Sequence, residues 1–157
     1  MTESFNRLIQ QNQGRIRYIA MRYCRSDDKD DLVQEILMQL WRSFNTFKGD
    51  AQVSTWLYRV ALNTALGYAR KHNKMPAQTE LNKSHEKAVT EHTTQADLLQ
   101  AYLNALNDTD AALLILYLDD IAVNEIADIL GISANATSAR ISRIKQFLES
   151  TFVGGDV

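Results

Sequence analysis

The sequence VNEIADILGIS occupies residues 123–133 and leads directly into a longer run of helix-forming residues. Within it, Ala127 is small enough for two helices to cross closely, and Gly131 can adopt the left-handed conformation that ends a helix. Ile132 would close a small core, and the hydroxyl of Ser133 can cap the N-terminus of the following helix. These features are typical of a helix-turn-helix, although an ordinary corner between two helices has a similar local pattern.

The helix predicted to begin at Ser133 has an inward and an outward face. Residues predicted to face inward recur at a spacing of three and four: they are Thr137, Ile141, Ile144 and Leu148. In a DNA-binding helix-turn-helix this second helix enters the major groove, where its N-terminal amides can also hold a phosphate. Its candidates for DNA contact are Ser133, Asn135, Ser138, Arg140, Ser142, Arg143, Lys145 and Gln146.

The C-terminal part of the chain is poor in cations for a DNA-binding protein. Residues 95–157 contain three cationic side chains, Arg140, Arg143 and Lys145, against nine Asp and Glu. The non-specific affinity of a protein for DNA grows with the number of phosphate charges that it neutralises. We therefore expect this part to bind DNA weakly alone and to reach its site with the help of another protein.

Composition and charge divide the chain into two helical domains. With 6 Gly and 1 Pro among 157 residues, and without strand-like alternation, the sequence predicts an all-α protein. Residues 1–75 hold 12 Lys and Arg against 7 Asp and Glu, whereas residues 76–157 hold 5 against 12. The single proline, Pro76, lies at this switch and opens a polar stretch. We interpret residues 76–94 as a flexible linker between a first domain, 1–75, and a second, 95–157.

Three helices are predicted in the first domain and four in the second. In the first domain, one helix is expected to run to about Cys24, with a weak point at Gly14. A second runs from the acid-rich start at 26–31 to about 44, and a third from about Ser54 to the basic residues 70–74. In the second domain they span about 95–106, 108–118, 123–130 and 133–150. Asn107 or Asp108 is the expected N-cap of the second of these.

Other features exclude several classes of protein. The chain has no apolar run of about 18 residues for a membrane span, and its first residues lack the pattern of a signal peptide. Its single cysteine, Cys24, cannot form an internal disulfide or a thiolate zinc site. The acidic run 27–31 is too local for a metal site, and no phosphate loop or catalytic triad is present. We therefore expect a cytoplasmic protein without cofactor, metal or catalytic residues.

Two groups of motifs, in the same order along the chain, resemble the bacterial RNA polymerase sigma factors of the sigma-70 family, in their small extracytoplasmic-function (ECF) group. DDLVQEILMQLW at 30–41 resembles the polymerase-binding helix, and VSTWLYRVALN at 53–63 resembles the promoter-melting segment. EIADILGIS at 125–133 and RISRIK at 140–145 resemble the second DNA-binding domain. The resemblance implies a non-catalytic initiation factor built from sigma region 2 and sigma region 4.

The resemblance also implies partners and residue roles. Core RNA polymerase would bind through the coiled coil of its β′ subunit and the flap of its β subunit. The contacts on the first domain would be Asp31, Gln34, Glu35 and Met38. The loop at 44–53 and the helix after it would capture an extruded base of the −10 element and engage the non-template strand. Their candidates are Phe47, Lys48, Trp56, Tyr58, Arg59, Asn63, Arg70 and Lys71. The helix-turn-helix would read the −35 element, and an anti-sigma factor is a further partner known in the family.

Some interpretations stay open at this stage. Trp56 suits a core position as well as a DNA surface, and Arg70 and Lys71 suit a solvated helix end. The family usually has valine at the buried position of Thr137, so its hydroxyl needs a bond back to a carbonyl. The family often has a cation near Ser138, and its absence lowers the −35 affinity that we expect. Two other functions are a DNA-binding regulator that acts without polymerase and a protein-binding helical adaptor.

Overall fold

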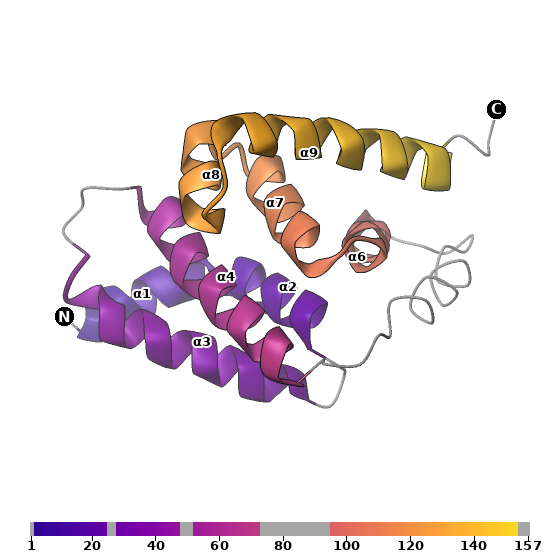
Figure 1. The fold of residues 1–157 in the computed structure, drawn as a ribbon. Helices are drawn as coiled ribbons and strands as arrows, with labels where there is room; N and C mark the ends of the chain where they lie inside the picture. Colours follow the sequence, from indigo (N-terminus) through magenta and orange to yellow (C-terminus); the bar gives the residue numbers. More distant parts are fainter. Residues whose placement is uncertain (1, 25–27, 48–51, 73–94, 154–157) are drawn as a thin grey trace. The chain divides into compact units, whose positions relative to one another are not determined.

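The computed structural model of the protein describes residues 2–24, 28–47, 52–72 and 95–153. In these residues it contains eight α-helices and no strand (Figure 1), so the prediction of an all-α protein is confirmed. The chain divides into two compact units, Met1–Met75 and Pro76–Val157. The predicted linker at 76–94 lies outside the described residues. No helix within the described ranges is both long and apolar enough to span a lipid bilayer.

The first unit is built around the helices that carry its candidate binding residues. Its helices are α1 (Thr2–Gln11), α2 (Gln13–Tyr23), α3 (Lys29–Phe44) and α4 (Val53–His72). The helices α3 and α4 pack along each other, and α2 packs against both. One side of α3 is fully buried at a four-residue spacing, through Leu32, Ile36 and Leu40. The main buried residues of α4 are Trp56, Leu57, Tyr58, Ala61, Leu62, Ala65 and Ala69.

The first unit has four described helices instead of the predicted three, because the first one is interrupted. The interruption lies at Asn12, and the prediction of a weak point at Gly14 was wrong. Asn12 is buried, and its Nδ2 donates a hydrogen bond to the carbonyl oxygen of Leu8 at 2.8 Å. Its Oδ1 accepts a bond from Nη1 of Arg15 at 2.6 Å. Side-chain bonds of this kind compete with the backbone ladder and favour a break.

The second unit has four α-helices, as predicted. They are α6 (Gln95–Ala105), α7 (Asp108–Leu118), α8 (Val123–Leu130) and α9 (Ala134–Leu148), and α9 continues as a π-helical segment, Glu149–Val153. Six consecutive residues of α7, from Ala111 to Leu116, are buried, which fits a helix that contacts α6, α8 and α9. The expected N-cap is Asn107, whose Oδ1 accepts a bond from the backbone N–H of Asp110 at 2.8 Å.

The turn between α8 and α9 has the predicted geometry of a helix-turn-helix. Gly131 ends α8 with φ +72°, and the N–H of Ile132 donates to the carbonyl oxygen of Ala127 at 3.0 Å. The hydroxyl of Ser133 caps α9 by accepting a bond from the N–H of Ala136 at 3.0 Å. Thr137 is fully buried, and its hydroxyl donates back to the carbonyl oxygen of Ser133 at 2.8 Å. The hydroxyl thus has the backward bond that its burial required.

Candidate functional site

The helix α9 presents a polar surface opposite its buried face. Thr137, Ile141 and Ile144 are buried and Leu148 is half-buried, so the predicted inward face is confirmed. Among the predicted DNA candidates, the exposed residues are Ser133, Asn135, Ser138, Ser142, Arg143, Lys145 and Gln146. Arg140 is only partly exposed.

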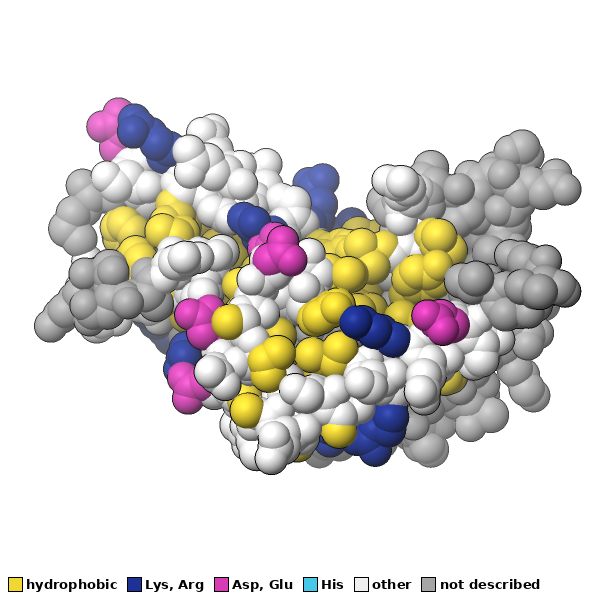
Figure 2. All heavy atoms as spheres, turned by 90° about the horizontal axis from the view of Figure 1, so that it is seen from above, with side chains coloured by type: hydrophobic (Ala, Val, Ile, Leu, Met, Phe, Trp, Pro, Cys, Tyr) yellow, Lys and Arg dark blue, Asp and Glu magenta, His cyan; other side chains and the backbone are white. Residues whose placement is uncertain are grey.

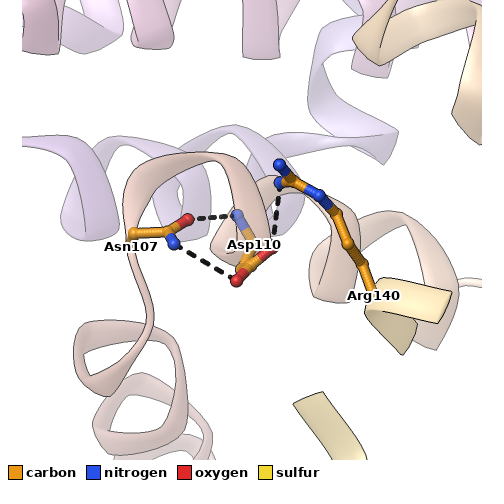
Figure 3. A network of polar contacts seen from close by, with 3 residues as sticks. All are labelled: Asn107, Asp110 and Arg140. Carbon is orange, nitrogen blue, oxygen red and sulfur yellow. Dashed lines mark hydrogen bonds and ion pairs between the residues drawn. The ribbon is translucent and has the colours of Figure 1, made fainter. Parts of the chain in front are cut away.

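Two cations of α9 interact with side chains of their own unit. The guanidinium of Arg140 forms an ion pair with the carboxylate of Asp110 on α7, with Nη1 and Oδ1 separated by 3.2 Å (Figure 3). The ammonium of Lys145 lies 4.8 Å from the centre of the Tyr117 ring, in cation–π geometry. On the face shown in Figure 2, the visible Lys and Arg side chains of the described residues lie in several separate places and form no continuous basic patch.

A shallow groove in the second unit runs beside the ion pair of Arg140. Its volume is about 420 Å³. It is lined by Ala105, Leu106, Asn107, Asp110, Arg140, Arg143, Ile144 and Phe147. The lining thus combines apolar side chains with charged groups of both signs. Sequence patterns did not indicate this groove, because its walls come from segments about 30 residues apart in the chain.

The predicted polymerase-binding residues form one exposed stripe on α3. Asp31, Gln34, Glu35 and Met38 are all exposed, and their spacing of three, one and three places them on the same side of a helix. Met38 exposes 46% of its surface, and Trp41, three residues further on, exposes 46% as well. Exposed apolar side chains of this size next to polar ones are common in protein interfaces.

A groove between α3 and α4 brings part of this stripe together with predicted DNA-binding residues. Its volume is about 680 Å³. From α3 and the residue before it come Asp28, Asp31, Glu35 and Gln39; from α4 come Asn63, Thr64, Gly67, Tyr68, Lys71 and His72. The wall from α3 is therefore acidic, and the end of the α4 wall is basic. The spacing of residues in the sequence predicts which side chains share one side of α3 or of α4. It does not predict that these two sides line the same groove.

The electrostatics of this groove are visible at Tyr68. Its ring stacks on the ring of His72, with the two centres 4.1 Å apart and an interplanar angle of 17°. Desolvation and then the negative charge of Asp28, with smaller contributions from other groups, raise the pKa of the Tyr68 hydroxyl above its ordinary value. Tyr68 therefore stays neutral at physiological pH and can donate a hydrogen bond within the groove.

The predicted −10 residues separate into exposed and buried groups. Arg59, Asn63, Arg70 and Lys71 are exposed on α4. Trp56 and Tyr58 are buried, with 8% and 3% of their surfaces exposed. For Trp56, the core position that the sequence left open is the one observed, and its ring stacks on half-buried Phe47 at 4.9 Å. Lys48 lies outside the described residues.

Tyr58 has a structural environment that the sequence analysis did not anticipate. Its hydroxyl accepts a hydrogen bond from Nε of Arg15 on α2 at 3.2 Å, and the guanidinium lies 5.8 Å from its ring centre. Arg15 also bonds to Asn12, so Tyr58 is joined to the break between α1 and α2. A contact between Tyr58 and DNA would require this side chain to leave the core. No local signal indicated Arg15, because it lies 43 residues away in the sequence.

The described residues contain no group of three or more His, Cys, Asp and Glu that could hold a metal ion. Cys24 is a free thiol of intermediate exposure. Burial, and then the negative charges of Asp28 and Asp31, raise its pKa to about 11. The thiolate is the nucleophilic form of cysteine, so this residue is a weak nucleophile at neutral pH.

Comparison with known proteins gives the same family at both ends of the chain. The Sigma-70 region 2 family matches residues 8–75, and the Sigma-70 region 4 family matches residues 96–148. The ECF RNA polymerase sigma-E factor of Haemophilus influenzae is 26% identical, with 94% of this chain and 87% of that protein covered. The sigma-E factor of Escherichia coli K12 is 24% identical, with 94% and 86% covered.

Solved structures share the fold. The sigma factor RpoE, in complex with the anti-sigma factor NepR from Bartonella quintana, superposes with a TM-score of 0.71 at 20% identity, over 94% of this chain and 96% of that one. CnrH, in complex with the cytosolic domain of CnrY, superposes with a TM-score of 0.64 at 20% identity, over 96% and 91%.

The two helical units, one of them ending in a helix-turn-helix, are thus regions 2 and 4 of a sigma factor, and the chain belongs to the sigma-70 family. Within that family it is a member of the extracytoplasmic-function group, an alternative sigma factor that directs transcription initiation. Family membership favours this function over a regulator that acts without polymerase and over a protein-binding adaptor.

Proposed function

We propose that this sigma factor binds core RNA polymerase through the exposed stripe of α3 and engages the −10 element with the exposed side of α4. The observation that carries the proposal is the groove between these helices, where Asp31 and Glu35 of the stripe face Asn63 and Lys71. A polymerase surface seated on α3 would lie beside the strand held by α4. Cationic and amide side chains on an exposed helix suit a strand-tracking surface.

The −35 element is read by the outward face of α9 in this proposal. That face carries Asn135, Ser138, Ser142 and Arg143, all of them exposed. Asn and Ser can bond to base edges, and Arg143 can contact a base or a phosphate. With so few cations, the isolated protein binds duplex DNA weakly, and polymerase supplies most of the affinity.

The proposal assigns the protein to the cytoplasm with polymerase, promoter DNA and an anti-sigma factor as partners, and it assigns no catalytic role. Both solved relatives are described in complexes: RpoE with the anti-sigma factor NepR, and CnrH with the cytosolic domain of CnrY. Their likeness in fold, over more than nine-tenths of this chain, supports an inhibitory partner of the same kind.

Co-migration with sigma-free core polymerase on a sizing column tests the polymerase interface. The parent protein should co-migrate, and the double variant Gln34→Ala with Met38→Ala should do so at least tenfold more weakly while its helical spectrum is unchanged. The matched control is Gln10→Ala with Gln11→Ala, which truncates two exposed residues of α1. A folded double variant that binds core polymerase as the parent does would reject the α3 stripe as the interface.

A further inference from the structure

The side chain of Arg140 points away from the outward face of α9. Successive residues of an α-helix turn by about 100°, so Arg140 lies roughly 70° from the centre of the buried face, whereas Ser142 and Arg143 lie roughly 130° from it. The side chain of Arg140 is 34% exposed and that of Asp110 is 23% exposed. Arg140 thus stands on the flank of α9, where α9 faces the start of α7 (Figure 3).

Asp110 is held in place by the helix cap to which it belongs. Its backbone N–H donates to Oδ1 of Asn107 at 2.8 Å, and its Oδ2 accepts a bond from Nδ2 of Asn107 at 3.2 Å. Its other carboxylate oxygen, Oδ1, pairs with Arg140. Asn107 and Asp110 therefore form a reciprocal cap at the first turn of α7, and the carboxylate presented to Arg140 has few alternative positions.

We infer that Arg140 is a positioning residue of the DNA-reading helix rather than a DNA contact. Through Asp110 it fixes the orientation of α9 relative to the first turn of α7, whose buried residues form the centre of the second unit. This fixed orientation sets the angle at which Asn135, Ser142 and their neighbours meet the major groove. The inference rests on the proposed function, since it concerns the helix that reads the −35 element.

A double-mutant cycle on the holoenzyme tests the inference. The probes are duplexes that the parent holoenzyme selects from a randomised pool, and the variants are Arg140→Gln, Asp110→Asn and both together. Each single variant should lower the affinity for the selected duplex by about three- to tenfold, and the double variant should lower it no further. Thermal unfolding of each variant, followed separately, ensures that affinity is measured on folded protein.

The salt dependence of binding separates positioning from a phosphate contact. Each phosphate contact contributes about 0.9 to the slope of log affinity against log salt concentration. Arg140→Gln should therefore leave this slope unchanged, whereas Arg143→Gln, the matched variant on the outward face, should reduce it. Asp120→Asn, an exposed site in the same unit, controls for the loss of one negative charge.

A lower salt slope for Arg140→Gln together with a higher DNA affinity for Asp110→Asn would overturn the inference. If Arg140 contacts a phosphate, Arg140→Gln reduces the slope by about 0.9, and Asp110→Asn raises the affinity because it releases the guanidinium and removes a negative charge. Additive losses in the double variant would also overturn it. Failure of the proposed function is distinguishable, because the parent holoenzyme would then select no duplex and Arg143→Gln would have no effect.

Discussion

Three described glycines differ in backbone conformation but not in the space around them, which allows a clean test of the turn at Gly131. A Cβ added at Gly14, Gly67 or Gly131 would meet no heavy atom within 4 Å. Gly131 has φ +72°, a left-handed conformation that costs an L-residue about 1–2 kcal/mol. Gly67 lies inside α4 and Gly14 lies in the first turn of α2, and alanine is better than glycine in a helix by about 0.5–1 kcal/mol.

We therefore predict that Gly131→Ala destabilises the second unit, whereas Gly14→Ala and Gly67→Ala stabilise the first. For units of this size, 1 kcal/mol corresponds to a change of about 4–8 °C in melting temperature. Gly131→Ala should lower the melting temperature of the second unit by roughly 4–16 °C. Each of the other variants should raise that of the first by roughly 2–8 °C. Differential scanning calorimetry of the full chain measures both transitions.

Whether Gly131→Ala lowers or raises the stability of the second unit decides whether the left-handed turn constrains the chain. Gly131→Asn should cost less than Gly131→Ala, because asparagine tolerates the left-handed conformation at helix ends. If Gly131→Ala is neutral or stabilising, the left-handed turn does not constrain the chain at this position. The turn between α8 and α9 would then not depend on glycine at position 131.

Three further predictions concern single side chains. Thr137→Val should change the free energy of unfolding by less than about 1 kcal/mol, because the buried methyl group gains about what the lost hydroxyl bond contributed. The carbonyl of Ser133 still accepts the backbone N–H of residue 137 at 2.9 Å. Thr137→Ala should cost about 2 kcal/mol in urea unfolding. The raised pKa of Cys24, about 11, should make its alkylation by iodoacetamide roughly tenfold slower in the folded than in the urea-unfolded protein below pH 9. Because the folded state keeps this proton longer, stability should fall as the pH rises from about 9 towards about 11; an equal alkylation rate in both states would contradict the burial of the thiol. Asn63→Ala should reduce promoter opening more than polymerase binding, and a permanganate footprint identical to that of the parent would refute this role.

Features set by residues close in the sequence were predictable. The glycine turn at 131, the caps at Ser133 and Asn107, and the backward bond of Thr137 all join groups within five residues of one another. Their geometry follows from side-chain chemistry and the helical repeat alone. The bounds of the four helices in the second unit were accordingly predicted to within a few residues.

Features set by tertiary contacts were not predictable in the same way. The bond between Arg15 and Tyr58 spans 43 residues, and the ion pair between Asp110 and Arg140 spans 30. Helical periodicity tells which side of a helix is apolar, but it does not tell which polar side chain on its flank meets another helix. The sequence therefore assigned Tyr58 and Arg140 to DNA, although both have partners within the protein.

The aromatic side chains of the first unit form a connected series from α1 to α4. The ring of Phe5 contacts the rings of Trp41 and Phe44 edge to face, with ring centres 5.0 and 5.3 Å apart. The ring centre of Trp56 lies 6.2 Å from that of Phe44 and 4.9 Å from that of Phe47.

The intrinsic fluorescence of the two tryptophans in this series can report on the first unit. The chain has two tryptophans, of which Trp41 is 46% exposed at the end of the α3 stripe and Trp56 is 8% exposed at the start of α4. Because the indole of Trp41 is exposed to water and that of Trp56 is buried, the two should emit at different wavelengths. In Trp56→Phe the remaining emission comes from Trp41 and should change when a partner covers the α3 stripe, whereas in Trp41→Phe it comes from Trp56 and reports the packing of α4 in the core of the first unit. The two variants can thus follow the α3 surface and the core of the first unit separately, without an added label.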